Sequence, residues 1–172
     1  VIDLNKPQLL KGFNEVTKGN GYYKARLSTA ASPKELMAGN YMLRSISKAK
    51  NTDHVIYTME SFEQYPDLHY ATLDFKKSIR LTHGIDQQKD YLWGTAELVS
   101  WISLDGRKLE GVVYKPADFD PAKKYPMIVS FYERNSETLF NYRMPEPHRS
   151  TIDYHLYNSN GYIVFNPDIR YV

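Results

Sequence analysis

The 172-residue sequence contains no cysteine, so disulfide bonds, cysteine-ligated zinc sites and thiol nucleophiles are all excluded. It also lacks a long apolar run. Polar residues interrupt every hydrophobic stretch well before the roughly 20 residues that a membrane-spanning helix needs. The sequence therefore predicts no membrane span.

The sequence also has no large excess of charge of either sign. The 22 lysines and arginines face 20 aspartates and glutamates, so the formal net charge is only +2. Basic residues are interleaved with acidic ones, as in residues 74–77 and 120–124, and form no basic block. Because the usual electrostatic footprint is missing, a nucleic-acid partner is not expected.

Several motifs of catalysis are missing as well. No Gly-x-Ser-x-Gly nucleophile elbow exists, and Ser136 and Ser159 lie in other sequence contexts. No glycine-rich loop could hold a phosphate. The histidines show no metal-ligand spacing, so neither a metal nor a cofactor is expected; they are His54, His69, His83, His148 and His155.

Tyrosine, in contrast, is abundant, with 15 residues in a chain that is 14% aromatic. Tyrosine suits a half-buried pleated surface, because its ring packs on a core while its hydroxyl reaches water or a partner. This composition predicts a β-rich protein. It also leaves open a non-enzymatic β-rich module that binds peptide or carbohydrate through exposed tyrosines.

Residues 1–92 alternate short strand-like segments with turn residues. The segments at 22–27, 55–59, 68–73 and 78–82 have strand character, and Ser32-Pro33 followed by Glu35 could begin a helical turn. This pattern favours an antiparallel sheet, a sandwich or a propeller blade.

Residues 97–114 give the clearest local signal, a β-hairpin around Asp105-Gly106. A two-residue turn at this dipeptide would place Ile102 opposite Leu109 and Leu98 opposite Val113. Apolar side chains would then share one face of the hairpin.

The character of the sequence changes after residue 116. Residues 126–132 are mostly apolar and predict a strand buried on both faces, and residues 162–165 predict another. Between them, residues 150–153 can cap a helix that ends near Gly161. A strand, helix and strand in this order form the unit of a parallel sheet. We therefore expect the end of an all-β domain, residues 1–94, and the start of an α/β domain, residues 95–172. The abrupt ends of the chain suggest a piece of a longer protein.

An ordered set of motifs is present at residues 65–71 and 80–83, 97–116, 119–129 and 161–170. Together these motifs resemble the prolyl oligopeptidase family of serine peptidases, in the branch of dipeptidyl peptidase IV and acylaminoacyl peptidase. Residues 97–116 resemble the entry to the hydrolase domain of that family. Residues 119–129 resemble its "D-P-x-K-K-Y-P-hydrophobic" approach to the next strand, and residues 161–170 its "G-Y-x-V … D-x-R" strand. Residues 65–71 and 80–83 resemble its closing propeller blade. The ordered set covers roughly residues 53–172.

The resemblance implies a mixed β and α/β fold, in which an antiparallel propeller blade precedes the N-terminal part of an α/β-hydrolase sheet. It implies a fragment of a serine-type peptidase that hydrolyses peptide bonds through an acyl-enzyme. The catalytic Ser, Asp and His would lie beyond this chain, which alone would be inactive. The substrate would be a peptide. A periplasmic or otherwise extracytoplasmic location is compatible with the family, but the chain itself carries no address and leaves the location open.

The resemblance also assigns residues. Tyr132 falls where these enzymes carry a tyrosine whose hydroxyl donates to the oxyanion of the tetrahedral intermediate, although packing of its ring at a strand end is an equal alternative. Asp168 and Arg170 match the D-x-R element, and we interpret them as residues that fix a loop through ion pairs or hydrogen bonds.

One departure from the family pattern follows Tyr132. Many relatives continue with Gly-Gly-Pro or Ala-Gly-Pro, whereas this chain has Glu133-Arg134-Asn135. Because Glu and Arg resist positive φ angles, we expect a loop of different shape and do not carry over dipeptidyl peptidase specificity. The strand before this loop would also be unpaired on one side, which predicts self-association through a free sheet edge.

Overall fold

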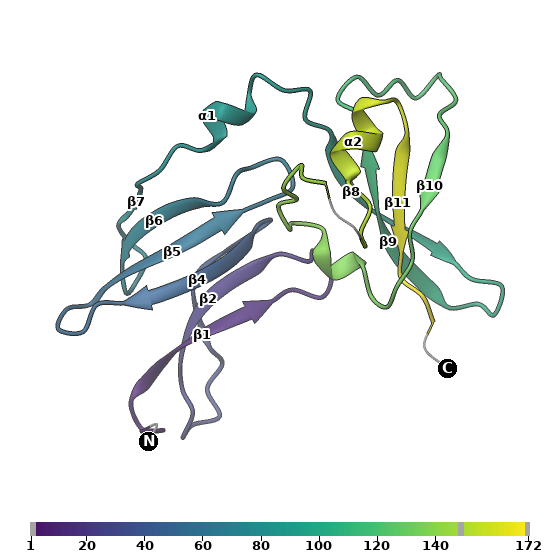
Figure 1. The fold of residues 1–172 in the computed structure, drawn as a ribbon. Coiled ribbons are helices and arrows are strands. Elements are labelled where there is room, and N and C mark those ends of the chain that lie inside the picture. Colours follow the sequence, from purple (N-terminus) through teal and green to yellow (C-terminus); the bar gives the residue numbers. More distant parts are fainter. Residues whose placement is uncertain (1–2, 148–149, 171–172) are drawn as a thin grey trace. The chain divides into compact units, whose positions relative to one another are not determined.

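The computed structural model describes residues 3–147 and 150–170, which fold into two compact units (Figure 1). Unit 1 comprises Val1–Glu60 and Pro66–His83, and unit 2 comprises Ser61–Tyr65 and Gly84–Val172. Three β-sheets and few helices make up the regular structure. The β-rich prediction is therefore confirmed.

The first sheet of unit 1 is antiparallel and has the order β1-β2-β3. Its strands are β1 (Pro7–Phe13), β2 (Asn20–Arg26) and β3 (Lys34–Gly39). The helical turn expected from Ser32-Pro33 is wrong, because the chain continues as strand β3. Tyr22 pairs with Met37 across the two strands, and Met37 packs on the buried core of unit 1. Non-local pairing thus outweighs the local capping signal.

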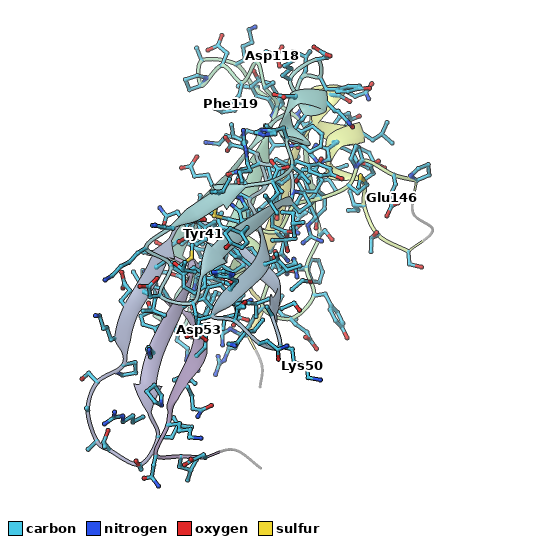
Figure 2. All side chains as sticks on the ribbon, turned by 90° about the vertical axis from the view of Figure 1, so that its left-hand side faces the viewer. Tyr41, Lys50, Asp53, Asp118, Phe119 and Glu146 are labelled. Atoms are coloured by element: carbon cyan, nitrogen blue, oxygen red, sulfur yellow. The ribbon has the colours of Figure 1, made fainter. Side chains whose placement is uncertain are left out.

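The second sheet of unit 1 is an antiparallel meander with the order β4-β5-β6-β7. Its strands are β4 (Met42–Lys48), β5 (His54–Glu60), β6 (Asp67–Thr72) and β7 (Ser78–Arg80). Figure 2 shows Tyr41 in the connection before β4, and Lys50 and Asp53 in the loop between β4 and β5. Four antiparallel strands in sequence order are compatible with a propeller blade. The buried core of this unit consists of Tyr22, Leu43, Val55, Tyr57 and Ala71.

Unit 2 contains a mixed sheet with the order β10-β11-β9-β8 (Figure 1). Its strands are β8 (Thr95–Ile102), β9 (Lys108–Lys115), β10 (Met127–Val129) and β11 (Ile163–Pro167). Strands β10 and β11 are parallel, and the other neighbours are antiparallel. The helices are α1 (Ile85–Gln88), the 3-10 helix η1 (Ser136–Thr138) and α2 (Tyr154–Ser159). Its buried apolar core consists of Phe62, Val112, Tyr114, Leu139 and Val164.

The strand–helix–strand unit predicted for the second half of the chain is confirmed. Helix α2 lies between β10 and β11 in the sequence, and Asp153 caps its first turn by accepting a hydrogen bond of 3.1 Å from Leu156 N. Gly161 follows the helix with φ +77°, a conformation that glycine adopts without strain. The sequence signals therefore located both ends of this helix.

The predicted β8–β9 hairpin is present, but its expected register is wrong by one residue. Trp101 lies opposite Leu109, and Leu98 lies opposite Val112. The loop has three residues rather than two, because Ser103 N donates to Arg107 O at 2.8 Å and Gly106 adopts φ +78°. A turn that ends in a left-handed glycine adds one residue to the connection and shifts every cross-strand pair.

The expectation of a strand buried on both faces at residues 126–132 is also wrong. Strand β10 has only three residues, and Met127 and Val129 are each about half exposed, at 51% and 49%. Among the described residues β10 pairs only with β11, so it forms an edge of the sheet. An apolar run therefore predicted the strand but not its burial.

Candidate functional site

The candidate site lies where the parallel strands β10 and β11 end. Val129 pairs with Phe165 in the parallel register, and Ser130 N donates to Phe165 O at 2.9 Å. Because parallel strands run in the same direction, the segments that follow them meet at one edge of the sheet. Ligands of open α/β sheets bind beyond such carboxyl ends.

Tyr132 belongs to the segment that follows β10, and its residue surface is 75% exposed. The neighbouring Phe131 is 64% exposed. The Tyr132 ring is therefore largely open to solvent in the described part of the chain. A phenol O–H is a hydrogen-bond donor, and here it is accessible to a ligand.

Asp168 lies just after β11 and holds the loop that follows Tyr132. Its Oδ1 accepts hydrogen bonds from Asn135 N at 2.6 Å and from Ser136 N at 2.7 Å. Its Oδ2 accepts a third from Ser136 Oγ at 2.6 Å. Hydrogen bonds to a carboxylate are among the stronger ones in proteins. The carboxylate therefore joins the two segments that leave the parallel strands.

Asn135 connects the same two segments through its side chain. Its Nδ2 donates to Tyr132 O at 2.9 Å and to Pro167 O at 3.0 Å. Tyr132 and Asp168 are thus brought together through Asn135. Neither Asn135 nor Ser136 was a candidate from the sequence, where Ser136 drew attention only as a serine without a nucleophile motif. Only their closeness to Tyr132 could have signalled their role.

Glu133 adopts φ +55°, the left-handed conformation that L-residues rarely take. Its carbonyl accepts a hydrogen bond of 3.0 Å from Ile169 N, which ties it to the segment after β11. The sequence argument expected a loop of different shape because Glu resists a positive φ angle, and Glu133 nevertheless adopts one. The surrounding hydrogen bonds impose the conformation on a residue that does not favour it.

Arg170 makes a different contact from its neighbour Asp168. Its guanidinium forms an ion pair with Asp105 in the β8–β9 turn. The pKa of the Asp105 carboxyl lies below its usual value, mainly because the Ser103 hydroxyl donates a hydrogen bond to it, and Arg170 adds to the effect. Arg170 therefore links the segment after β11 to a hairpin tip rather than to Tyr132.

A separate cavity of about 620 Å³ lies elsewhere in unit 2. Aromatic side chains line much of it: Trp93 stacks on Tyr142 with ring centroids 5.4 Å apart, and Tyr65 meets Tyr142 edge-on at 5.3 Å. Trp93 Nε1 donates to Phe62 O at 2.7 Å, which fixes the indole. The volume of this cavity lies in the range of small-molecule binding sites.

The remaining expectations concern metals, membranes and surface tyrosines. Residues 3–147 and 150–170 hold no group of three or more potential metal ligands, and His148 lies outside this range. In the same part of the chain, no helix is long and apolar enough to cross a membrane. Tyr22, Tyr57 and Tyr114 are buried in the cores of their units. These three rings are therefore not available to a tyrosine-lined binding face.

Comparisons with known proteins give a match at the level of structure. No protein-family model matches the chain, and no curated protein matches it by sequence. A dipeptidyl peptidase 4 from Porphyromonas gingivalis matches with a TM-score of 0.72 and 18% identity, over 97% of this chain and 23% of that one. A prolyl endopeptidase matches with a TM-score of 0.63 and 14% identity, over 96% and 23%.

A third match is the acylaminoacyl peptidase from Pyrococcus horikoshii, with a TM-score of 0.59 and 16% identity, over 88% of this chain and 22% of that one. The chain therefore spans about a quarter of the length of the structures that it matches. It has the fold of a segment shared by dipeptidyl peptidase IV, prolyl endopeptidase and acylaminoacyl peptidase structures.

Proposed function

We propose that this chain is part of a serine peptidase of the prolyl oligopeptidase family. In this assignment residues 1–94 are the end of a β-propeller, and residues 95–172 are the start of an α/β-hydrolase domain. The fold likeness to peptidases over nearly the whole chain supports the assignment. The mixed sheet of unit 2, with its parallel pair β10–β11, is consistent with the start of a hydrolase sheet.

The reaction that we assign to the whole protein is hydrolysis of a peptide bond through an acyl-enzyme. The catalytic Ser, Asp and His would come from parts of the protein outside this chain, and no cofactor is needed. Attack on the peptide carbonyl moves negative charge onto its oxygen. In this proposal the phenol of Tyr132, which is exposed in the segment after β10, donates a hydrogen bond to that oxygen. This exposed phenol is the observation that carries the proposal.

The decisive variant is Tyr132→Phe in the full-length protein, because it removes the hydroxyl and keeps the ring. Loss of one oxyanion donor should lower kcat on a peptide substrate by about 10²–10³-fold while KM changes little. Tyr91→Phe is the matched control, since Tyr91 is similarly exposed and lies far from β10 in the sequence. An unchanged kcat for Tyr132→Phe would remove Tyr132 from the mechanism.

The gene gives an independent test. Sequencing through the codon after Val172 should reveal a reading frame with a Gly-x-Ser-x-Gly elbow and a later Asp and His. A stop codon at that position would overturn the peptidase assignment. Purified residues 1–172 should hydrolyse no peptide, and saturable hydrolysis by them would contradict the placement of the triad.

The alternative function is a non-enzymatic module that binds peptide or carbohydrate. The aromatic cavity beside Trp93 is the observation that favours it. Titration of the chain with oligosaccharides and short peptides, followed by tryptophan fluorescence, tests this function. A saturable change that is lost in Tyr142→Ala, together with a stop codon after Val172, would establish it over the peptidase.

A further inference from the structure

Asn135 is the N-cap residue of helix η1, yet its side chain does not cap that helix. An asparagine at this position normally accepts a hydrogen bond from the N–H of the second or third helical residue. The carboxamide of Asn135 makes no such bond. The N–H of the first helical residue, Ser136, donates to Asp168 Oδ1.

The carboxamide joins the ends of the two parallel strands. Nδ2 has two N–H groups, and its two acceptors are Tyr132 O at 2.9 Å and Pro167 O at 3.0 Å. Pro167 is the last residue of β11, and Tyr132 is the third residue after β10. One amide group therefore fixes the main chain at Tyr132 relative to the neighbouring strand.

Asn135 is itself held in place on both sides. Its N–H donates to Asp168 Oδ1 at 2.6 Å, and its carbonyl accepts hydrogen bonds from Thr138 N at 2.9 Å and Thr138 Oγ1 at 2.8 Å. A group anchored in this way can act as a fixed support rather than as a mobile surface side chain.

Tyr132 needs such a support because its own side chain is largely exposed. Packing cannot direct the phenol, so its direction depends on the main chain at residues 132 and 133. The hydrogen bond from Asn135 Nδ2 fixes the carbonyl of Tyr132, and that from Ile169 N fixes the carbonyl of Glu133. These two bonds restrain the peptide that follows Tyr132.

We propose that Asn135 is a positioning residue, which directs the phenol of Tyr132 by tying Tyr132 O to Pro167 O. This inference rests on the proposed function, because it requires that the Tyr132 hydroxyl acts on the oxyanion. Asn135 itself touches no reacting atom. A misplacement of about 1 Å in a catalytic group can cost up to 10²-fold in rate.

A double-mutant cycle in the full-length protein tests the proposal. Its members are Asn135→Ala, Tyr132→Phe and the combination, and kcat and KM are measured for each with one peptide substrate. Asn135→Ala should lower kcat by about 10-fold to 10²-fold with little change in KM. In the Tyr132→Phe background the same substitution should have almost no effect, because the hydroxyl that it positions is already absent.

Two further variants separate positioning from a general loss of structure. Asn135→Asp keeps the shape of the side chain but replaces the Nδ2 donor by an oxygen that faces two carbonyl groups. It should therefore lower kcat at least as much as Asn135→Ala. If Asn135→Ala fails to fold, Asn135→Asp takes its place in the cycle. Asn160→Ala is the matched control, because Asn160 Nδ2 also donates to a main-chain carbonyl, Leu156 O, at 2.7 Å. It should leave kcat unchanged.

The outcomes distinguish the two proposals. If Tyr132→Phe lowers kcat and Asn135→Ala lowers it by the same additional factor in both backgrounds, the positioning role is overturned and the role of Tyr132 stands. An unchanged kcat in Asn135→Ala and Asn135→Asp would likewise overturn the positioning role of Asn135. If Tyr132→Phe leaves kcat unchanged, the proposed function of Tyr132 fails, and the positioning role fails with it.

Discussion

The hydroxyl of Ser136, a fully buried residue, donates a hydrogen bond of 2.6 Å to Oδ2 of Asp168. The same carboxylate accepts the N–H groups of Asn135 and Ser136 through Oδ1. One side chain after β11 thus satisfies three donors of the segment after β10. A buried donor that loses its acceptor lowers the free energy of unfolding, so the contact between Ser136 and Asp168 contributes much of the local stability.

Asp168→Ala should lower the free energy of unfolding of the 172-residue chain by about 2–3 kcal/mol, because it leaves three donors without their acceptor. Ser136→Ala removes only the hydroxyl and should cost about 1 kcal/mol. Urea denaturation followed by circular dichroism measures both. Equal losses for the two variants would show that the main-chain hydrogen bonds of Asp168 contribute nothing.

The sequence predicted the elements of unit 2 well where the signals are local. Asp153 and Gly161 marked the ends of α2 because capping and left-handed glycine are properties of a few neighbouring residues. The hairpin register failed because one extra loop residue, which no hydrophobic pattern reveals, shifts all pairs. Strand β3 was missed because its pairing with β2 is a non-local interaction.

The candidate site was predictable only in part. The resemblance pointed to Tyr132 and Asp168, but the residue that contacts both, Asn135, has no sequence motif of its own. Its contact with Pro167 depends on the parallel pairing of β10 and β11, which brings residues more than 30 positions apart into hydrogen-bond distance. Such relationships depend on tertiary structure and not on local pattern.

Glu133→Gly should stabilise the chain or leave its stability unchanged, although most substitutions by glycine destabilise. A non-glycine residue pays about 1 kcal/mol for a left-handed conformation, and glycine avoids that cost while losing more chain entropy on folding. The net change should lie between zero and about 1 kcal/mol in favour of the variant. Glu137→Gly in η1 is the control and should destabilise by about 0.5–1 kcal/mol. Destabilisation of similar size in both variants would contradict the strain at Glu133.

The 172-residue chain should self-associate through the free edge of β10. In the described residues this strand pairs only with β11, and its half-exposed Met127 and Val129 offer an apolar edge to a second strand. Sedimentation velocity over a range of concentrations should show a concentration-dependent increase in mass. Val129→Lys should suppress it, since a charge on an edge strand opposes pairing, whereas Leu104→Lys in the exposed β8–β9 turn should not. A monomer at every concentration would disprove the prediction.

The stability of unit 1 should fall as the pH decreases below about 6.5, because of His69. The His69 ring stacks on Tyr57 with centroids 5.3 Å apart, and its Nε2 has no hydrogen-bond partner among the described residues. Burial is the main cause that lowers the pKa of this imidazole; Arg80 lowers it further, and Asp67 opposes the shift. The unfolded chain therefore binds a proton near pH 6.5 that the folded chain binds only at lower pH.

This difference fixes the sign of the effect. Full stability is present above the pKa of His69 in the unfolded chain, and it is lost as the pH falls toward the pKa of His69 in the folded chain. For one proton the slope of the free energy of unfolding is at most about 1.4 kcal/mol per pH unit. Hydrogen exchange of the β5 and β6 amides between pH 8 and pH 5, corrected for intrinsic rates, measures it. His69→Phe keeps an aromatic ring against Tyr57 and should flatten the pH dependence of protection in these strands. If the variant retains the wild-type slope, another group is responsible, and the buried imidazole of His69 does not set the acid sensitivity of this unit.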